Sequence, residues 1–412
     1  MARRVRKSVL LLGNYPPPSG GVPRHLEYLA PYLVSRGWDV HILSAGGSGT
    51  THEDGFTVHK PPRLRRALTL PQAARLWRGS QFPHWSLAAH APRRWLAYMA
   101  YAAVARGIIE TRGTSIISAY NLHATGPTGA LLSETYGIPL VVSNFGELLS
   151  MTPFFRTHLP VVRYVTRVGK VLLSCSRHCA KSYGILGLAP AVRVIPYGVD
   201  VDRFSPRPDG SPFRRRLGLP EADPVVLFVG RMTRDMGLHT ILEAAPLVWQ
   251  RQRNVRFLIV GASGELLPRA REMASRFPIV VAADVPFADL PSYYAAATVA
   301  LVPTLGDRAC SSLAAMEAMA SGVPVIGAAI GGIPEVIEDG VSGILVPPGD
   351  PPALANDILH LLQDDPLRGR LAHVGRQVVE RDFDQRRTNA AVEAVFQELL
   401  GLPDEASPHP TS

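Results

Sequence analysis

Cysteine is scarce in this sequence, with three in 412 residues. Three thiols cannot form a disulfide framework, and this usage suits a reducing compartment. Cys175 and Cys179 lie on either side of His178 in the chain, which would suit a metal site only if a second cluster of ligands accompanied them. The sequence offers no such cluster at a suitable spacing, so we expect no disulfide and no bound metal.

A long apolar run is also missing. The nearest, Trp95 to Ile109, is interrupted by Arg106 and Gly107, and it falls short of the roughly 18 apolar residues that a membrane-spanning helix needs. The basic start of the chain is followed by only four or five apolar residues before Gly13, which is too short for an export signal. The sequence therefore predicts a cytoplasmic protein that does not cross a membrane.

Acidic residues are absent between Asp54 and Glu110, although the net charge of the whole chain is only +9. Basic and aromatic side chains interleaved in this way suit an anionic surface, such as the inner face of a membrane, or an acidic ligand. The alternative is an ordinary solvated face rich in arginine. No recognised nucleic-acid motif accompanies the charge, so we expect no nucleic-acid partner. This basic segment 60–106 contains Lys60, Arg63, Arg65, Arg66, Arg75, Trp77, Arg78, Trp85, Arg93, Arg94, Trp95 and Arg106.

The rest of the composition is that of a folded α/β protein. Hydrophobic residues make up 46% of the chain and charged residues 19%, which excludes a wholly disordered chain. Apolar strand patterns alternate with helical patterns in residues 1–200 and again in residues 224–383. We therefore predict two Rossmann-like domains facing a central cleft, joined by a linker at 201–223. Residues 401–412 are predicted to be a disordered tail.

Two stretches have the residue types of a nucleotide site. Gly20 and Gly21 lie between a predicted strand and a predicted helix, where glycine lets a ligand approach the backbone, although such pairs also occur in plain turns. Ser311 and Ser312 are suited to cap an alanine-rich helix, whose start favours an anion by roughly 0.3–1 kcal/mol per charge. Glu317 on that helix could reach a ribose diol. The alternative is a buried crossover helix whose one glutamate points to solvent.

Five motifs in this order resemble the family 4 retaining glycosyltransferases of the GT-B architecture, also called glycosyl transferases group 1. The resemblance implies transfer of a sugar from a nucleoside diphosphate sugar to an acceptor, with no cofactor and no obligatory metal. It also implies an acceptor-binding N-terminal domain, a donor-binding C-terminal domain and a final helix, 384–400, that packs back on the N-terminal domain. The motifs are SGGVPRHLEYLAPYLVSRGWDV, VIPYGVDVDRF, FVGRMTRDMGLHTILEA, LPSYYAAATVALVPT and LAAMEAMASGVPVIGAAIGGIPEVIEDGVSGILVPPGD.

The resemblance assigns roles position by position. Arg231 matches the cation on the donor diphosphate, where a guanidinium would stabilise the charge of the leaving group. Glu317 matches the carboxylate that binds the ribose, and both are expected to be catalytic residues. The positions that match the glycine loops, the contact to the base and the phosphate-binding helix start are Gly20, Gly21, Gly230, Val285, Ser311, Ser312 and Leu313.

Three positions depart from the family pattern. Met236, Ala309 and Phe145 stand where the family usually has a lysine, a glutamate and a histidine around the donor sugar. These departures fit an unusual donor, or a protein that binds a nucleotide or saccharide without transferring it. The acceptor is left open between an envelope or lipid-linked saccharide and a small metabolite. The side chains that we expect near the acceptor or the donor sugar are Arg24, Tyr120, His123, Phe145 and Glu147.

Overall fold

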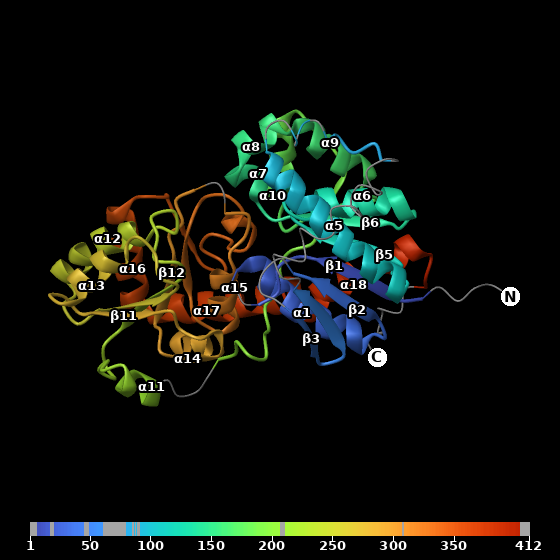
Figure 1. The fold of residues 1–412 in the computed structure, drawn as a ribbon. Helices are drawn as coiled ribbons and strands as arrows, with labels where there is room; N and C mark the ends of the chain where they lie inside the picture. The colour runs from blue at the N-terminus through green and yellow to red at the C-terminus, as the bar shows by residue number, and fades with distance from the viewer. Residues whose placement is uncertain are drawn as a thin grey trace. The chain divides into compact units, whose positions relative to one another are not determined.

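The computed structural model describes residues 6–16, 20–44, 49–60, 80–84, 86, 88, 91–206, 211–306 and 309–403. The chain divides into two compact units (Figure 1). Unit 1 comprises Met1–Pro196 and Arg386–Ser412, and unit 2 comprises Tyr197–Gln385. Unit 2 is therefore continuous in sequence, whereas unit 1 is completed by the C-terminal part of the chain.

Unit 1 is built on an eight-stranded sheet in the order β3-β4-β2-β1-β5-β6-β7-β8. All neighbouring strands are parallel except β3 and β4, which form an antiparallel hairpin at the edge. The central strands β1, β5 and β6 are buried throughout and largely apolar, because parallel strands are covered on both faces. The strands are β1 (Ser8–Leu12), β2 (Asp39–Leu43), β3 (Gly49–Glu53), β4 (Phe56–Lys60), β5 (Ile116–Tyr120), β6 (Leu140–Asn144), β7 (Val171–Ser174) and β8 (Val192–Val194).

Side chains of β1 alternate between the two faces of this sheet. Leu10 and Leu12 join the core under α5, α6 and α9, while Val9 and Leu11 join the core under α1 and α18. Each such fully buried side chain contributes roughly 1.5–3 kcal/mol relative to exposure. The helices of unit 1 are α1 (Gly21–Ser35), α5 (Pro92–Arg112), α6 (Gly126–Tyr136), α7 (Glu147–Ser150), α8 (Thr152–Thr157), α9 (Leu159–Val168), α10 (Arg177–Lys181), the 3-10 turn η1 (Ser182–Leu186) and α18 (Gln385–Leu400).

The buried carboxylate of Glu393 connects the last helix, α18, to the rest of unit 1. Glu393 is fully buried and accepts hydrogen bonds from the Trp38 indole N–H (3.0 Å), the Tyr32 hydroxyl (3.1 Å) and Arg36 Nε (3.2 Å). Val392, Val395 and Phe396 of α18 add apolar contacts to the same core. A buried charge is tolerated when several donors satisfy it together, as they do at this position.

Unit 2 is built on a six-stranded, wholly parallel sheet in the order β11-β10-β9-β12-β13-β14. Helices cover both of its faces, with α12 and α16 over one core and α15 over the other. The strands are β9 (Val225–Val229), β10 (Arg256–Gly261), β11 (Ile279–Ala283), β12 (Val299–Val302), β13 (Val325–Ala328) and β14 (Ile344–Val346). The helices are α11 (Ser211–Arg216), α12 (Leu238–Arg251), α13 (Leu267–Ala274), η2 (Phe287–Asp289), α14 (Leu290–Ala295), α15 (Leu313–Ala320), η3 (Ile333–Glu335), α16 (Pro351–Gln363) and α17 (Asp365–Asp382).

The segment 201–223, expected to be a linker, is part of unit 2. Val201, Phe204 and Leu219 are buried in its core, and Arg214 of α11 donates a hydrogen bond from Nε to the Ala296 carbonyl (2.9 Å). These anchors are isolated residues without helical or strand spacing, so the segment has no apolar periodicity in the sequence.

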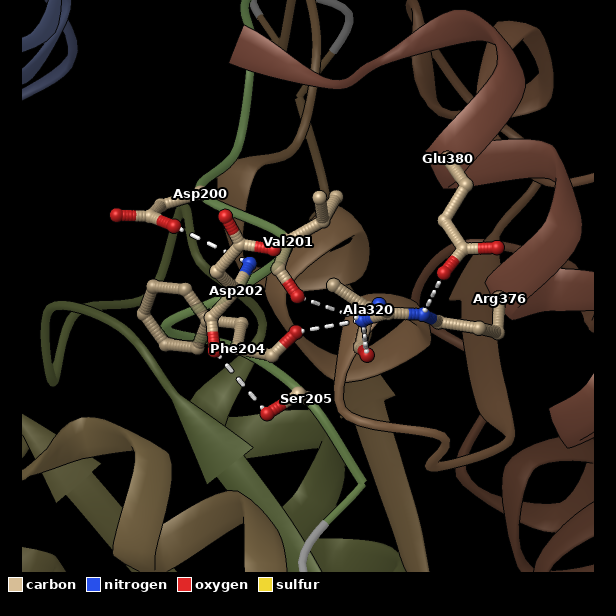
Figure 2. A network of polar contacts seen from close by, with 8 residues as sticks. All are labelled: Asp200, Val201, Asp202, Phe204, Ser205, Ala320, Arg376 and Glu380. Atoms are coloured by element: carbon tan, nitrogen blue, oxygen red, sulfur yellow. Dashed lines mark hydrogen bonds and ion pairs between the residues drawn. The ribbon is translucent and has the colours of Figure 1, made fainter. Parts of the chain in front are cut away.

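Arg376 of α17 connects the start of unit 2 to α15 (Figure 2). Its guanidinium donates hydrogen bonds to the carbonyls of Val201 (3.0 Å), Phe204 (2.7 Å) and Ala320, the last residue of α15. Glu380 holds the other side of the guanidinium at 2.6 Å. Carbonyls at the end of a helix lack partners within the helix, and a cation there also complements the helix dipole. Arg376 thus fixes the C-terminal end of α15.

Much of the basic segment 60–106 lies outside the described residues, including Arg63, Arg65, Arg66, Arg75, Arg78, Trp77 and Trp85. Two of its described members, Arg94 and Trp95, contact other side chains of unit 1. Arg94 lies over the ring of Phe154, at 4.2 Å from the centroid, and the Trp95 indole donates a hydrogen bond to His84 (3.1 Å). In the part of the chain that the structure describes, α5 included, we find no helix with both the length and the apolar character to span a bilayer.

Candidate functional site

The sheet of unit 2 has a switch point between β9 and β12. The chain leaves β9 toward β10 on one side and later returns to β12 on the other side. In such sheets, ligands bind outside the carboxyl ends of the strands at this point. Two segments follow these ends, the loop from Gly230 to Gly237 after β9 and the loop from Pro303 to Ser312 after β12.

Arg231 begins the first of these loops. Its side chain is 59% exposed and its Nη2 lies 2.9 Å from the Asp235 carboxylate in an (i, i+4) ion pair. The same nitrogen lies 3.8 Å from the sulfur of Met236, the residue that replaces the usual lysine. Met236 packs against the core of unit 2. The guanidinium is therefore an accessible cation directly after β9, with one exposed carboxylate to orient it.

The two loops touch through their backbones. Gly237 has φ +80°, and a Cβ atom there would lie 1.7 Å from the Pro303 carbonyl oxygen. The Leu305 N–H also donates to the Asp235 carbonyl (3.0 Å). Only glycine fits a position with both a positive φ and such a close contact. The geometry of Arg231 thus depends on the loop that follows β12.

Helix α15 begins at the end of the second loop. The Ser312 hydroxyl accepts a hydrogen bond from the Ala315 N–H (3.1 Å) and caps the helix, as expected for this residue type. Glu317 is 6% exposed, and its Oε2 accepts a hydrogen bond from the Tyr294 hydroxyl (2.9 Å). The alternative of a glutamate that points to solvent therefore does not hold. No pattern in the sequence indicates Tyr294 as the partner.

Ala309 stands where the family usually has a glutamate, and backbone contacts hold its turn in place. Its carbonyl accepts a hydrogen bond from the Gly332 N–H (2.7 Å), and a Cβ atom on Gly331, at φ +62°, would lie 2.3 Å from the same oxygen. The backbone is thus held in place, but the methyl side chain offers no polar atom.

Val285 follows a residue with an unusual backbone conformation. Asp284 has φ +56°, and its carboxylate accepts hydrogen bonds from the Ser263 N–H (2.9 Å) and hydroxyl (2.6 Å). The Asp284 N–H donates to the Gly261 carbonyl (2.7 Å). These bonds tie the end of β11 to the end of β10 and fix the backbone at Val285.

In unit 1, the corresponding switch point lies between β1 and β5. Gly20 precedes α1, Gly21 is its first residue, and the Gly20 carbonyl accepts a hydrogen bond from the Arg24 N–H (3.0 Å). The Arg24 side chain is half-buried and pairs with Glu27, one turn further along α1. The glycine pair thus lies at the start of a helix, at the end of the sheet where ligands bind.

An aromatic cluster follows β5 and β6 at the same end of the sheet. Tyr120 and Phe145 are stacked, with ring centroids 6.0 Å apart and planes at 1°. His25 of α1 lies 5.4 Å from the first ring and 5.9 Å from the second. Burial lowers the pKa of His25 to about 4, so the imidazole is neutral at pH 7. Phe145, in place of the usual histidine, continues an apolar cluster.

Two expected contact residues turn toward the protein. The His123 ring packs against Phe155, and burial together with Arg94 lowers its pKa to about 4. Glu147 is 6% exposed. Its Oε1 accepts a hydrogen bond from the Leu122 N–H (2.7 Å) and its Oε2 accepts one from the Phe145 N–H (2.8 Å). Both carboxylate oxygens thus bind the backbone of the loops after β5 and β6, and a contact between Glu147 and a sugar stays a prediction.

The sequence matches two family models that together cover both units. Residues 19–203 match the model described as Glycosyltransferase Family 4, and residues 223–364 match that described as Glycosyl transferases group 1. Over 293 residues the chain is 35% identical to a D-inositol 3-phosphate glycosyltransferase of Xylanimonas cellulosilytica, covering 66% of this chain and 69% of that relative. The chain is a family 4 glycosyltransferase.

A second relative of this glycosyltransferase has the same name as the first. A D-inositol 3-phosphate glycosyltransferase of Corynebacterium urealyticum is 33% identical over 233 residues, which are 53% of this chain and 54% of that relative. The predicted family and enzyme class are confirmed, and the alternative of a binding protein without transferase activity is not favoured.

Solved structures share the fold of this glycosyltransferase. Sucrose-phosphate synthase from Thermosynechococcus elongatus superposes with a TM-score of 0.75 at 21% identity, covering 96% of this chain and 100% of that chain. HepE from Anabaena, in complex with UDP, superposes with a TM-score of 0.73 at 21% identity, covering 95% and 100%. The predicted GT-B fold with two Rossmann-like domains is confirmed.

Proposed function

We propose that this glycosyltransferase binds a nucleoside diphosphate sugar on unit 2 and transfers the sugar, with retention, to an acceptor bound on unit 1. One observation carries the proposal. Arg231 and the α15 start with Glu317 come from the two strands that flank the switch point of unit 2. A cation after one strand, with a capped helix and a carboxylate after the next, is the set of groups that a nucleoside diphosphate needs.

The proposed chemistry follows from these groups. As the bond from the anomeric carbon to the diphosphate oxygen breaks, negative charge develops on the leaving group, and Arg231 stabilises it. The acceptor oxygen forms its bond to the anomeric carbon on the same face. Its proton passes to a phosphate oxygen of the leaving group. Neither a side-chain nucleophile nor a metal or other cofactor takes part, so activity in EDTA should equal activity in added Mg²⁺.

The first acceptor to test is D-inositol 3-phosphate. The relative of which this chain covers 69% is named for this acceptor. D-inositol 3-phosphate is a small, acidic metabolite. A lipid-linked saccharide is the second candidate, favoured by the basic segment 60–106. Sedimentation with vesicles of phosphatidylglycerol, compared with vesicles of phosphatidylcholine, tests contact with an anionic membrane surface.

The decisive experiment separates donor binding from transfer. UDP, GDP and ADP are titrated by calorimetry, and the matching glucose, N-acetylglucosamine and mannose nucleotides are then followed for slow hydrolysis and for transfer to D-inositol 3-phosphate. NMR of the product reports the anomeric configuration. We expect one nucleotide to bind and its sugar to be transferred with retention. Nucleotide binding without hydrolysis or transfer across this panel would contradict the proposal.

A further inference from the structure

Glu147 occupies a special place in unit 1. It is the first residue of α7, directly after the loop that ends β6, and its side chain reaches back across that loop. One oxygen accepts from the Phe145 N–H in its own loop, and the other accepts from the Leu122 N–H in the loop after β5. One carboxylate therefore joins the loops that follow two adjacent strands, at the end of the sheet where ligands bind.

The loop after β5 needs such support. Asn121, immediately before Leu122, has φ +105°, a conformation that costs of order 1–3 kcal/mol for a residue with a side chain. Its N–H donates to the Ser143 carbonyl of β6 (3.0 Å), and its carbonyl accepts from the Gly126 N–H (2.8 Å). Such backbone strain persists only where the surroundings fix it, and it is common at functional sites.

Glu147 is buried beside titratable groups of two neighbouring elements. The groups that act on it electrostatically from the packed elements are Cys179 of α10 and Tyr183 of η1. Burial raises the pKa of Glu147 to about 7, although the N–H groups of Leu122, Phe145 and Glu147 itself oppose this rise. An ionised carboxylate accepts both loop bonds strongly, whereas a protonated carboxyl accepts them weakly. Charge on Glu147 thus controls how firmly the two loops are held.

We propose that Glu147 is the positioning residue of the acceptor side, and that its carboxylate holds Asn121 and Phe145 in the arrangement that productive transfer requires. It acts through the backbone of the two loops and does not touch the substrate. This inference rests on the proposed function, which places the acceptor on unit 1. Turnover should therefore rise with pH as Glu147 ionises, with an apparent pKa near 7.

The test compares Glu147→Gln with a matched control, Glu134→Gln. Glu134 likewise accepts two hydrogen bonds in unit 1, one from the Gln81 N–H (2.9 Å) and one from the Tyr164 hydroxyl (2.8 Å). Neither donor belongs to the loops after β5 and β6. A glutamine at 147 keeps the shape but offers one acceptor and turns an NH₂ group toward the second N–H. The measurements are the affinity for the nucleotide that the wild type binds, kcat against pH, and amide exchange.

The expected results separate positioning from folding. Glu147→Gln should lower kcat at pH 8 by at least tenfold and remove the step near pH 7. It should leave the affinity for the nucleotide that the wild type binds within twofold, because the proposed nucleotide site is on unit 2. Exchange of the Leu122 and Phe145 amides should become at least tenfold faster. Glu134→Gln should leave all of these unchanged and affect only the Gln81 amide.

Measurements on the wild type keep the inference testable if the variant does not fold. The ¹³C shift of the Glu147 carboxyl group should titrate near pH 7, and the protection factors of the Leu122 and Phe145 amides should rise over the same interval. Normal kcat and an unchanged pH profile in Glu147→Gln, or flat protection factors in the wild type, would overturn the inference. If the wild type transfers no sugar, the proposed function fails, while the amide measurements still decide whether Glu147 orders the two loops.

Discussion

Asn121 in unit 1 and Asp284 in unit 2 are the two non-glycine residues with positive φ in the described ranges. Each directly follows a parallel strand, β5 or β11. Asp284 is exposed and fixes its own backbone, since its carboxylate binds Ser263 of the neighbouring loop. Asn121 has direct backbone bonds to Ser143 and Gly126, and the Leu122 N–H beside it donates to the buried Glu147. A positive φ after a strand is thus accompanied by an exposed carboxylate in one unit and by a buried carboxyl group in the other.

The two units also differ in how far their other expected site residues are exposed. Unit 2 presents Arg231 to solvent on a loop whose geometry follows from close backbone contacts. Unit 1 turns Tyr120, His123 and Glu147 toward its own interior. We therefore expect substitutions in unit 2 to act on chemistry and nucleotide affinity, and substitutions of buried carboxylates in unit 1 to act through structure.

The largest effect is expected for Glu393→Ala in unit 1. It removes the buried acceptor of Trp38, Tyr32 and Arg36, and breaking a buried charged network costs about 3–5 kcal/mol. Urea denaturation should show this loss in the free energy of unfolding. The control is Glu398→Ala on the same helix, whose ion pair with Arg193 is exposed and which should leave the midpoint almost unchanged. Equal losses in the two variants would contradict the role of burial.

Arg231→Ala tests the chemistry of unit 2. Removing a group that stabilises the charge of the leaving group should lower kcat by about 10²–10³, or about 2.7–4 kcal/mol, without changing the thermal midpoint. Steady-state kinetics with the donor that the wild type uses gives the value. Arg269→Ala, an exposed arginine paired with Glu272 on α13, is the matched control and should keep full activity. Unchanged turnover in Arg231→Ala would remove this residue from the mechanism.

Glu317→Gln tests the nucleotide end of the donor. Hydrogen bonds to a charged group contribute about 1.5–3 kcal/mol, so affinity for the nucleotide that the wild type binds should fall by roughly 10- to 100-fold. Calorimetry measures the affinity, and Glu338→Gln, an exposed glutamate of unit 2, serves as the control. Unaltered nucleotide affinity would mean that Glu317 does not bind the nucleotide and only accepts the hydrogen bond from Tyr294.

The last prediction concerns pH. Burial lowers the pKa values of four histidines of unit 1 to about 4, whereas in unit 2 the described histidine with a lowered pKa is His239. The unfolded chain binds these protons near pH 6.5, so the free energy of unfolding of unit 1 falls as pH drops from about 6.5 toward 4. Glu147 acts in the opposite sense, because its pKa is raised. The four histidines are His25, His59, His84 and His123.

Amide exchange resolved by segment checks this prediction. Between pH 7.5 and pH 5, protection in β2 should fall further than protection in β10, after correction for the intrinsic rate. Replacing His59 by Gln should reduce the change in β2. Equal loss of protection in both sheets would mean that the histidines do not distinguish the units.

Apolar periodicity predicted most of the fold. The runs around β1, β9 and β10 are buried strands, and their order along the chain is sufficient for two α/β units. The hairpin strand β3 has the sequence GTTHE and is largely exposed, so it carries no apolar pattern and was missed. The helix α11 and its buried neighbours were assigned to a linker for the same reason.

The candidate site was predicted in part. Residue type and spacing identified Ser312 as a helix cap and placed Glu317 one and a half turns along the same helix. Spacing cannot tell which way a side chain turns, so the inward direction of Glu147 and the Tyr294 partner of Glu317 required the structure. The acceptor could not be predicted from the sequence, because the arrangement of the loops after β5 and β6 depends on contacts between residues distant in the chain.

The chain enters and leaves unit 2 at one place. The Val199 N–H donates to the Phe383 carbonyl (2.8 Å), and the Gln385 N–H donates to the Val199 carbonyl (3.0 Å), so the two ends of unit 2 are paired like strands. A domain with adjoining ends can be inserted into another with little disturbance of either. Unit 2 is therefore suited to exchange as a cassette. If the proposed function holds, replacing segment 197–385 with the corresponding segment of a relative should alter donor choice while keeping the acceptor.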